Sequence, residues 1–150
     1  MSLLNVIILS LSPISELRGA IPVGIAQGNN VFVVLFLAIL ANSLIVPLLF
    51  FFLDNLHNYF YKINIYRKLF DIYIEKNRHM MEDKIGNKIE FIFLVLFTGI
   101  PLPFTGAYTA TILAWFFGVE RKKAYPAIIL GVLIAGIIVT LASLGLFFLF

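Results

Sequence analysis

Long apolar runs, broken in two places by proline and glycine, make up most of this chain. In the first run, Pro13 and Pro22 argue against one straight helix, because proline removes a backbone donor and obstructs the preceding turn. Ser12 is a favourable N-cap, and Pro13 is a favourable first helical residue. The pattern therefore predicts two short helices, roughly 2–11 and 14–26, each about half as long as the hydrocarbon layer is thick.

A polar turn and a long apolar segment follow. Residues 27–30, with the sequence Gln-Gly-Asn-Asn, predict a tight turn. Residues 31–53 carry no charge, which predicts a transmembrane helix. Asn42 lies near its midpoint among small residues, a pattern typical of a helix contact face. Two roles remain open for Asn42, namely a hydrogen bond between helices and the lining of a site.

The middle segment, residues 54–90, differs from the rest in charge. It holds seven of the eleven Lys and Arg residues, and its polar and apolar residues alternate at helical spacing. This pattern predicts an amphipathic helix on the cytoplasmic face of the membrane. Gly86 is the expected end of that helix.

A second broken apolar run covers residues 91–117, and a final apolar span covers 124–150. The break is the sequence from Gly99 to Ala107, which contains two prolines and a further glycine. In the final span, small residues recur at every fourth position, which predicts close packing against another helix. These small residues are Ala127, Gly131 and Ala135.

The distribution of positive charge predicts the topology. Residues 121–123 are Arg-Lys-Lys, and a full crossing by 91–117 would place them opposite the basic segment 54–90, against the positive-inside rule. A run that enters the membrane and returns places both basic regions in the cytoplasm. The first run, with similar breaks, is expected to be re-entrant by analogy with the second.

The expected fold is an all-α integral membrane protein with a single membrane domain, residues 1–150. It consists of an inverted repeat of a re-entrant hairpin plus a transmembrane helix, a design typical of secondary transporters. The first repeat covers 1–53 and the second covers 91–150. The cytoplasmic amphipathic connector covers 54–90.

Composition supports a membrane protein and limits the chemistry. The chain is 61% hydrophobic and only 13% charged, unlike soluble domains. It contains no cysteine and only two isolated histidines, so we expect no metal site and no cofactor. The net charge of +3 is explained by orientation in the membrane better than by binding of nucleic acid.

The acid and the base in the first break are the strongest functional signal. A charged side chain near the centre of a bilayer costs about 3 kcal/mol or more, so Glu16 and Arg18 require partners or a use. We expect the two breaks to meet and to form a transport site. The candidate site residues come from both breaks and from the adjacent helices: Glu16, Arg18, Gly19, Pro22, Asn42, Thr98, Pro101, Pro103, Thr105 and Gly106.

The chemistry of these residues suits an anion and a proton. Each second half-helix begins near the middle of the membrane, where its N-terminus favours an anion. Arg18 adds a permanent charge and a forked donor. Glu16 can exist neutral or ionised, which makes it a candidate proton carrier. Because residues two apart point in different directions on a helix, we expect Glu16 and Arg18 to have different partners.

The charged pair also allows a purely structural interpretation. Glu16 and Arg18 can serve only to lock the hairpins together, each bound by backbone groups of the opposite tip. An enzyme is not expected, because the chain has no nucleophile-histidine-acid set, no paired carboxylates and no nucleotide loop in a membrane segment.

Two motifs resemble a known family. The sequence Glu16 to Pro22 (ELRGAIP) together with Pro101 to Ala107 (PLPFTGA) resembles the putative small multidrug export proteins. The chain departs from the family pattern at Phe104 and Tyr108, where glycine and tryptophan are common. The order of spans also resembles the DedA-type membrane proteins, which implies facing re-entrant loops and proton-dependent transport of lipid phosphate.

The expected function is therefore a small membrane exporter, and proton coupling is a candidate mechanism. Its cargo would be a small amphipathic compound or an anionic lipid phosphate, carried past a midplane site. The alternative is a non-transporting scaffold whose cytoplasmic helix recruits a partner. The expected location is the cell membrane, with several passes, and two spans with two hairpins enclose so little volume that we expect a homodimer or larger homo-oligomer.

Overall fold

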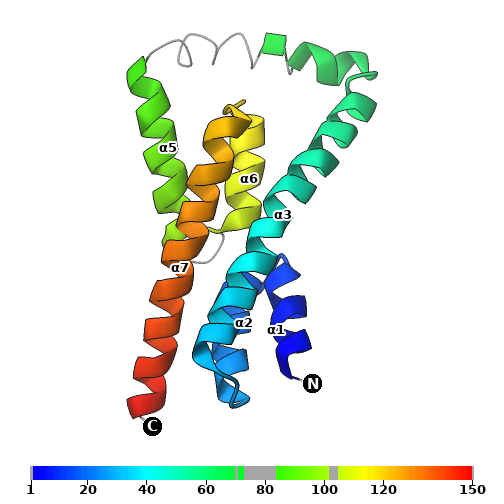
Figure 1. Ribbon diagram of the computed structural model, residues 1–150. Helices are drawn as coiled ribbons and strands as arrows, with labels where there is room; N and C mark the ends of the chain where they lie inside the picture. The colour runs from blue at the N-terminus through cyan, green and yellow to red at the C-terminus, as the bar shows by residue number, and fades with distance from the viewer. Residues whose placement is uncertain (1, 70, 73–83, 102–104, 150) are drawn as a thin grey trace.

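The computed structural model describes residues 2–69, 71–72, 84–101 and 105–149, and in these ranges the regular structure is entirely α-helical. Figure 1 labels the helices, and a further helical stretch covers 64–69 and 71–72. The labelled helices are α1 (Ser2–Leu11), α2 (Glu16–Ala26), α3 (Val31–Phe60), α5 (Lys84–Gly99), α6 (Ala107–Phe116) and α7 (Arg121–Leu149).

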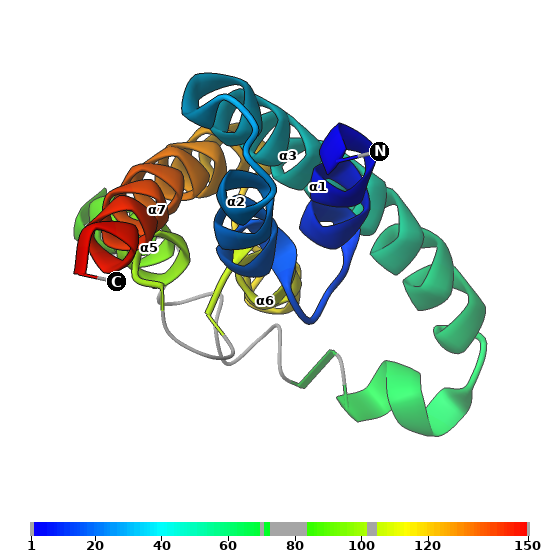
Figure 2. The same ribbon diagram turned by 90° about the horizontal axis from the view of Figure 1, so that it is seen from below.

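Two long helices run the length of the molecule, and each end carries a short helical hairpin (Figure 1). The α1–α2 hairpin lies at the end that holds both termini, and the α5–α6 pair lies at the other end. The second arms of the hairpins are α2 and α6, and each begins near mid-height. The two tips therefore face each other (Figure 1). Seen from below, α2 lies between α3 and α7 (Figure 2), and it packs on both. In the same way, α6 packs on both α3 and α7.

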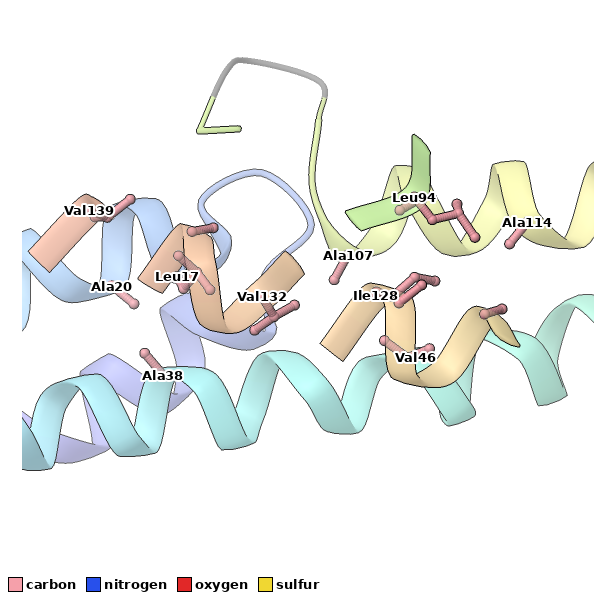
Figure 3. Packing of buried hydrophobic residues seen from close by; sticks show 14 of the residues in the cluster. Leu17, Ala20, Ala38, Val46, Leu94, Ala107, Ala114, Ile128, Val132 and Val139 are labelled. Atoms are coloured by element: carbon pink, nitrogen blue, oxygen red, sulfur yellow. The ribbon is translucent and has the colours of Figure 1, made fainter. Parts of the chain in front are cut away.

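Small side chains let these helices approach closely. Ala20, Ala38 and Ala107 are fully buried in the core shown in Figure 3. A Cβ added at Gly131 of α7 would lie 2.5 Å from Cβ of Thr98 and 2.9 Å from the carbonyl oxygen of Val95, both in α5. The predicted small-residue face of the last helix is therefore confirmed as a contact face.

The polar turn after α2 has the predicted form. Gly28 adopts a φ of 79°, which a residue without a Cβ tolerates best. The Asn29 side chain donates to the Gly24 carbonyl oxygen at 2.9 Å. Asn30 caps α3, because its Oδ1 accepts from the Phe32 N–H at 2.9 Å. These bonds satisfy backbone groups that the adjoining helix ends leave free.

The start of the second helix was predicted too early. Ser12 does not begin a helix, because its N–H still donates to the carbonyl oxygens of Ile8 and Leu9 at the end of α1. Residues 12–15 form a turn, and α2 begins at Glu16. The predicted pair of short helices is otherwise confirmed.

The predicted single amphipathic helix over 54–90 is wrong. Its first residues continue α3, which ends at Phe60, and the chain turns at 61–63. Its last residues belong to α5, which passes through Gly86 instead of ending there. A lone glycine weakens a helix by only about 1 kcal/mol, which packing of the following apolar turns can outweigh. Residues 73–83 of the predicted helix lie outside the described residues.

Two helices are long and apolar enough to cross a membrane: α3, and α7 over Arg121–Gly145. Both predicted spans are therefore helical, although α3 extends seven residues past its predicted end and α7 starts three residues earlier. The short helices α1, α2 and α6, with 10, 11 and 10 residues, are only about 15–17 Å long.

Candidate functional site

Arg18 of the first hairpin binds the tip of the second. Its Nη2 donates to Oγ1 of Thr105 at 2.9 Å and to the carbonyl oxygen of Ile100 at 3.4 Å. The Thr105 hydroxyl in turn donates to the same Ile100 carbonyl at 2.7 Å. The guanidinium group thus holds the end of α5 and the approach to α6 in one polar network.

Glu16 binds the same tip at a different place. Its Oε1 accepts from the Tyr108 N–H at 3.3 Å, and the Ala107 N–H is a second backbone donor to the carboxyl group. These N–H groups belong to the first turn of α6, where helix geometry leaves backbone donors free. The residue is 6% exposed. Glu16 and Arg18 therefore have different partners on the opposite hairpin, as the sequence predicts.

Gly106 makes this approach possible. A Cβ added at Gly106 would lie 2.1 Å from Oε2 of Glu16, far inside van der Waals contact. Gly106 is the N-cap residue of α6, and no side chain caps that helix from its own sequence. The carboxyl group of Glu16 takes the place of such a cap, and a residue without a side chain leaves room for it.

The backbone at Glu16 is unusual. Its φ is 47°, in the left-handed region, which costs a residue with a side chain roughly 1–2 kcal/mol. The preceding Ser15 donates from Oγ to the Leu9 carbonyl oxygen at 2.6 Å, which ties the turn back to α1. Strained backbone of this kind persists where the surrounding contacts fix it, and it is common at functional sites.

Tyr108 takes part in the contact between the tips, and the sequence argument named it only as a departure from the family pattern. Besides the N–H bond to Glu16, its hydroxyl donates to the Leu11 carbonyl oxygen at 2.5 Å. Tyr108 thus binds both the end of α1 and the start of α2. The sequence offered one signal for this role, because Tyr108 directly follows Gly106 and Ala107 of the second tip.

A cavity of about 610 Å³ lies between the two tips. This volume falls within the usual range for small-molecule sites. Glu16 and Arg18 line it from one hairpin, and Thr105 and Thr109 line it from the other. Its apolar wall includes Ile14, which is 95% exposed.

A second cavity, of about 390 Å³, lies on another side of Arg18. Pro22 and Pro101 line it together with residues of α7, and Pro101 also lines the first cavity. Gly19 lines the first cavity as well. Of the predicted site residues, Pro103 lies outside the described residues.

Asn42 of α3 and Thr98 of α5 lie next to the pair but bind neither charge. Asn42 and Thr98 are each 1% exposed. Among the described residues, Oδ1 of Asn42 and Oγ1 of Thr98 have no hydrogen-bond partner. Both line a narrow void that Glu16 also lines. Oδ1 of Asn42 therefore makes no hydrogen bond to another described helix. Of the two roles left open for Asn42, the geometry supports the lining of the site.

A second polar junction joins the two halves of the chain at the opposite end from the termini. Asp54 of α3 accepts from Nε1 of Trp115 at 3.2 Å and pairs with Arg121 at the start of α7. Trp115 also packs against His57, with ring centroids 5.6 Å apart. The Arg121 guanidinium lies over the Phe50 ring at 5.3 Å.

Comparison with known proteins supports the resemblance found in the sequence. The family described as putative small multi-drug export protein matches residues 16–138, from Glu16 at the first tip to the middle of α7. No curated protein and no solved structure matches the chain. The matched range begins just after the turn of the first tip, and it includes both polar junctions, all of α3 and the first part of α7. The chain is therefore a member of the family of putative small multi-drug export proteins.

Proposed function

We propose that this protein is a small proton-coupled membrane exporter whose working site lies between two facing re-entrant hairpins. The hairpins enter the membrane from opposite sides and meet at its midplane. The cargo is a small amphipathic compound or an anionic lipid phosphate. The protein acts as a transporter and not as an enzyme.

Helix length supports re-entrance. The hydrocarbon layer is about 30 Å thick, and α2 and α6, at 11 and 10 residues, reach only about half of it. By contrast, α3 with 30 residues and α7 with 29 are about 45 Å long. The arms that begin at the tips, α2 and α6, each pack on both α3 and α7. Non-helical backbone at membrane depth must be buried in protein or line a water-filled cavity, and the exposed turn of the first tip lines the cavity of about 610 Å³.

The packing order supports an inverted repeat. Each half consists of a hairpin followed by a long helix, and the two hairpins point in opposite directions (Figure 1). The second arm of each hairpin packs against the long helix of the other half, α2 on α7 and α6 on α3. This reciprocal exchange is the arrangement expected of two halves related by an axis in the membrane plane.

Charge supports one orientation of this repeat. The Asp54–Arg121 contact brings the start of the basic middle segment to the start of α7, where Lys122 and Lys123 follow. That end is the cytoplasmic side in the proposal, and the turn at Asn29 faces outside. Because the chain has no cysteine, single cysteines report topology cleanly. Cysteines at Asn64 and Lys122 should label from the cytoplasm and one at Asn29 from outside; outside labelling at Lys122 would contradict the re-entrant second hairpin.

The contact between the tips carries the proposal. A buried acid and a half-buried base of one hairpin bind the other hairpin on the wall of a shared cavity. Arg18 keeps its charge under any accessible condition, so it can hold an anionic group but cannot carry a proton. Glu16 can change its charge, and in the proposal it carries the proton that couples transport to the pH gradient.

The position of the cavity supports an amphipathic cargo. Its lining residues belong to the two hairpin tips and to the first turns of the helices that follow them, and not to the outer ends of the helices. The exposed Ile14 at its edge offers an apolar surface at that level, while Arg18 and Thr105 offer polar groups inside. A molecule with an apolar part and a charged head can reach such a site from within the bilayer. The proposal also includes a homodimer or larger homo-oligomer, since one chain encloses little volume.

A flux assay in proteoliposomes tests this function. Purified protein is reconstituted with either a fluorescent amphipathic dye or a short-chain fluorescent lipid phosphate as cargo. We expect protein-dependent flux of one cargo that rises with a pH gradient and falls when a protonophore removes the gradient. Flux equal to that of empty liposomes for both cargoes would contradict the proposal. It would leave the scaffold, with a cytoplasmic surface for a partner, as the remaining interpretation.

A further inference from the structure

A narrow void lies beside Glu16 in the centre of the molecule. Its lining comes from five of the labelled helices: α2, α3, the end of α5, the start of α6, and α7. The space is too narrow to admit a water molecule. Buried polar atoms at its wall therefore depend on the lining residues themselves for hydrogen bonds.

Two oxygen atoms at this wall have no such bond. They are Oδ1 of Asn42 and Oγ1 of Thr98, among the described residues, and both residues are 1% exposed. An unsatisfied buried polar atom is disfavoured, and native proteins keep few of them without a reason. These two project from different helices, α3 and α5, toward the same space.

The lining offers few groups that can donate to Oδ1 of Asn42. Leu17, Val132 and Ala135 have apolar side chains. Arg18 has its guanidinium directed to Thr105 and Ile100 at the tip. Two side chains remain: Thr98, whose hydroxyl can donate one hydrogen bond, and Glu16, which is an acceptor only when ionised but has an O–H donor when protonated.

We infer that Asn42 and Thr98 form a second position for the carboxyl group of Glu16, which that group occupies when it carries the proton. The ionised carboxylate stays at the first turn of α6 and accepts from the Tyr108 N–H, as observed. The protonated acid turns from α6 toward the side of the void that Asn42 and Thr98 line, donates its O–H to Oδ1 of Asn42, and accepts from the hydroxyl of Thr98 through its other oxygen. In this position the two oxygen atoms that lack a bond, Oδ1 of Asn42 and Oγ1 of Thr98, each have a partner.

This inference rests on the proposed proton coupling and gives it a structural step. Protonation moves the carboxyl group away from α6, and loss of the proton returns it. The move frees the N–H groups of Ala107 and Tyr108 and changes the charge beside Arg18 in the same event. Asn42 and Thr98 act as positioning residues for the proton on Glu16. The strained backbone of Glu16 is in keeping with a side chain that is held in one of two arrangements.

Infrared difference spectroscopy of the full chain in lipid vesicles tests the inference directly. The spectrum in acidic buffer minus that in alkaline buffer should show the C=O stretch of a protonated carboxyl group, and Glu16→Gln should remove it. In Asn42→Leu and in Thr98→Val the band should shift to higher frequency, because hydrogen bonds to a carboxylic acid lower that frequency. Ser10→Ala is the matched control: Oγ of Ser10 is also buried and has no partner among the described residues, but Ser10 does not line the void. It should leave the band unchanged.

Thermal stability in detergent gives a second readout, which a merely structural role would not produce. Thr98→Val keeps the side-chain shape and removes the hydroxyl. In alkaline buffer it should leave the melting temperature unchanged or raise it, because the hydroxyl has no partner there. In acidic buffer it should lower the melting temperature by about 3 °C, the effect of one lost hydrogen bond in a chain of this size. Ser10→Ala should act equally in both buffers.

The outcomes separate this inference from the proposed function. A band that keeps its frequency in both void variants, or the absence of any band assigned to Glu16, overturns the inference. A shifted band with no cargo flux supports the inference and contradicts the proposed transport. Flux that depends on the pH gradient with an unshifted band supports transport and contradicts the role of Asn42 and Thr98.

Discussion

The two polar junctions between the halves of this chain use charge in opposite ways. At the basic end, Asp54 and Arg121 pair with each other and are 37% and 48% exposed. At the tips, Glu16 and Arg18 each bind uncharged groups of the opposite hairpin, and Glu16 is buried. The first arrangement needs little from the protein, because water solvates both charges.

The difference shows where charge has a purpose other than holding the halves together. An exposed ion pair contributes at most about 1 kcal/mol, and apolar packing can replace it at small cost. A buried carboxyl group needs donors in place of water, and here α6 provides them at a site that only Gly106 leaves open. A neutral side chain would fill the tip contact more simply. The presence of an acid there is the reason to assign it a function.

The largest expected effect on stability comes from filling the space beside Glu16. Gly106→Ala places a Cβ where the carboxyl group lies and forces it away from the N–H groups of α6. Loss of a hydrogen bond to a charged group costs about 2 kcal/mol, so we expect the melting temperature in detergent to fall by about 6 °C.

A matched control for this change is Gly145→Ala. A Cβ at Gly145 meets nothing within 4 Å, and alanine favours a helix over glycine, so this variant should melt at the same temperature or slightly higher. Equal melting temperatures for Gly106→Ala and the wild type would mean that the Glu16–α6 contact contributes nothing to the tip junction.

The next effect concerns cargo. Arg18→Lys keeps the positive charge but loses the planar fork that reaches both Thr105 and Ile100. We expect the apparent affinity for cargo in the flux assay to fall about tenfold, the equivalent of one hydrogen bond to a charged group, while the response to a pH gradient remains. A variant that loses the pH response together with affinity would show that Arg18 also takes part in coupling.

A smaller effect is expected at Tyr108. Tyr108→Phe removes the hydroxyl that donates to the Leu11 carbonyl oxygen and leaves the backbone N–H to Glu16 in place. The melting temperature should fall by about 3 °C, as for one neutral hydrogen bond. Tyr59→Phe, at a residue that is 68% exposed, should have no measurable effect. The same fall in melting temperature in both variants would show that the hydroxyl of Tyr108 does not stabilise the tip junction.

The smallest effect is expected at the exposed junction. Asp54→Asn removes the pairing with Arg121 but keeps an oxygen that can accept from Trp115. We expect less than about 1 kcal/mol of lost stability, and a loss that shrinks further in high salt. Denaturation in low and high salt checks this. A larger loss than at Gly106 would reverse the proposed ranking of the two junctions.

Much of the fold was predictable because the breaks in the apolar runs are local signals. The breaks at Pro13 and Pro101 divide the runs into pieces too short to cross a bilayer, whereas Pro22 lies inside α2 and does not end it. Two pieces of that length are stable only if they cover each other or a longer helix. The meeting of the tips follows from this constraint, and the separate partners of Glu16 and Arg18 follow from their spacing of two residues.

The remaining features depend on contacts between distant parts of the chain. The left-handed backbone at Glu16 has no signal in the sequence, since the residue is neither Gly, Asn nor Asp. The N–H of Tyr108 became a partner of Glu16 only through the relative position of α2 and α6. The C-terminal end of α3 and the N-terminal end of α5 were predicted from the first charged residues, which mark the edge of the apolar run. A helix instead continues as far as its packing and hydrogen bonding do.

Gradient-driven flux through two carboxylate variants tests most directly whether Glu16 is the coupling residue. Glu16→Gln and Asp54→Asn each neutralise an acid that joins the two halves, one buried at the tips and one exposed at the basic end. With the fold retained in both, we expect flux through Glu16→Gln to lose its response to an imposed pH gradient and flux through Asp54→Asn to keep it. A wild-type response in Glu16→Gln would contradict the assignment of the coupling proton to Glu16 and would leave the tip contact a purely structural lock.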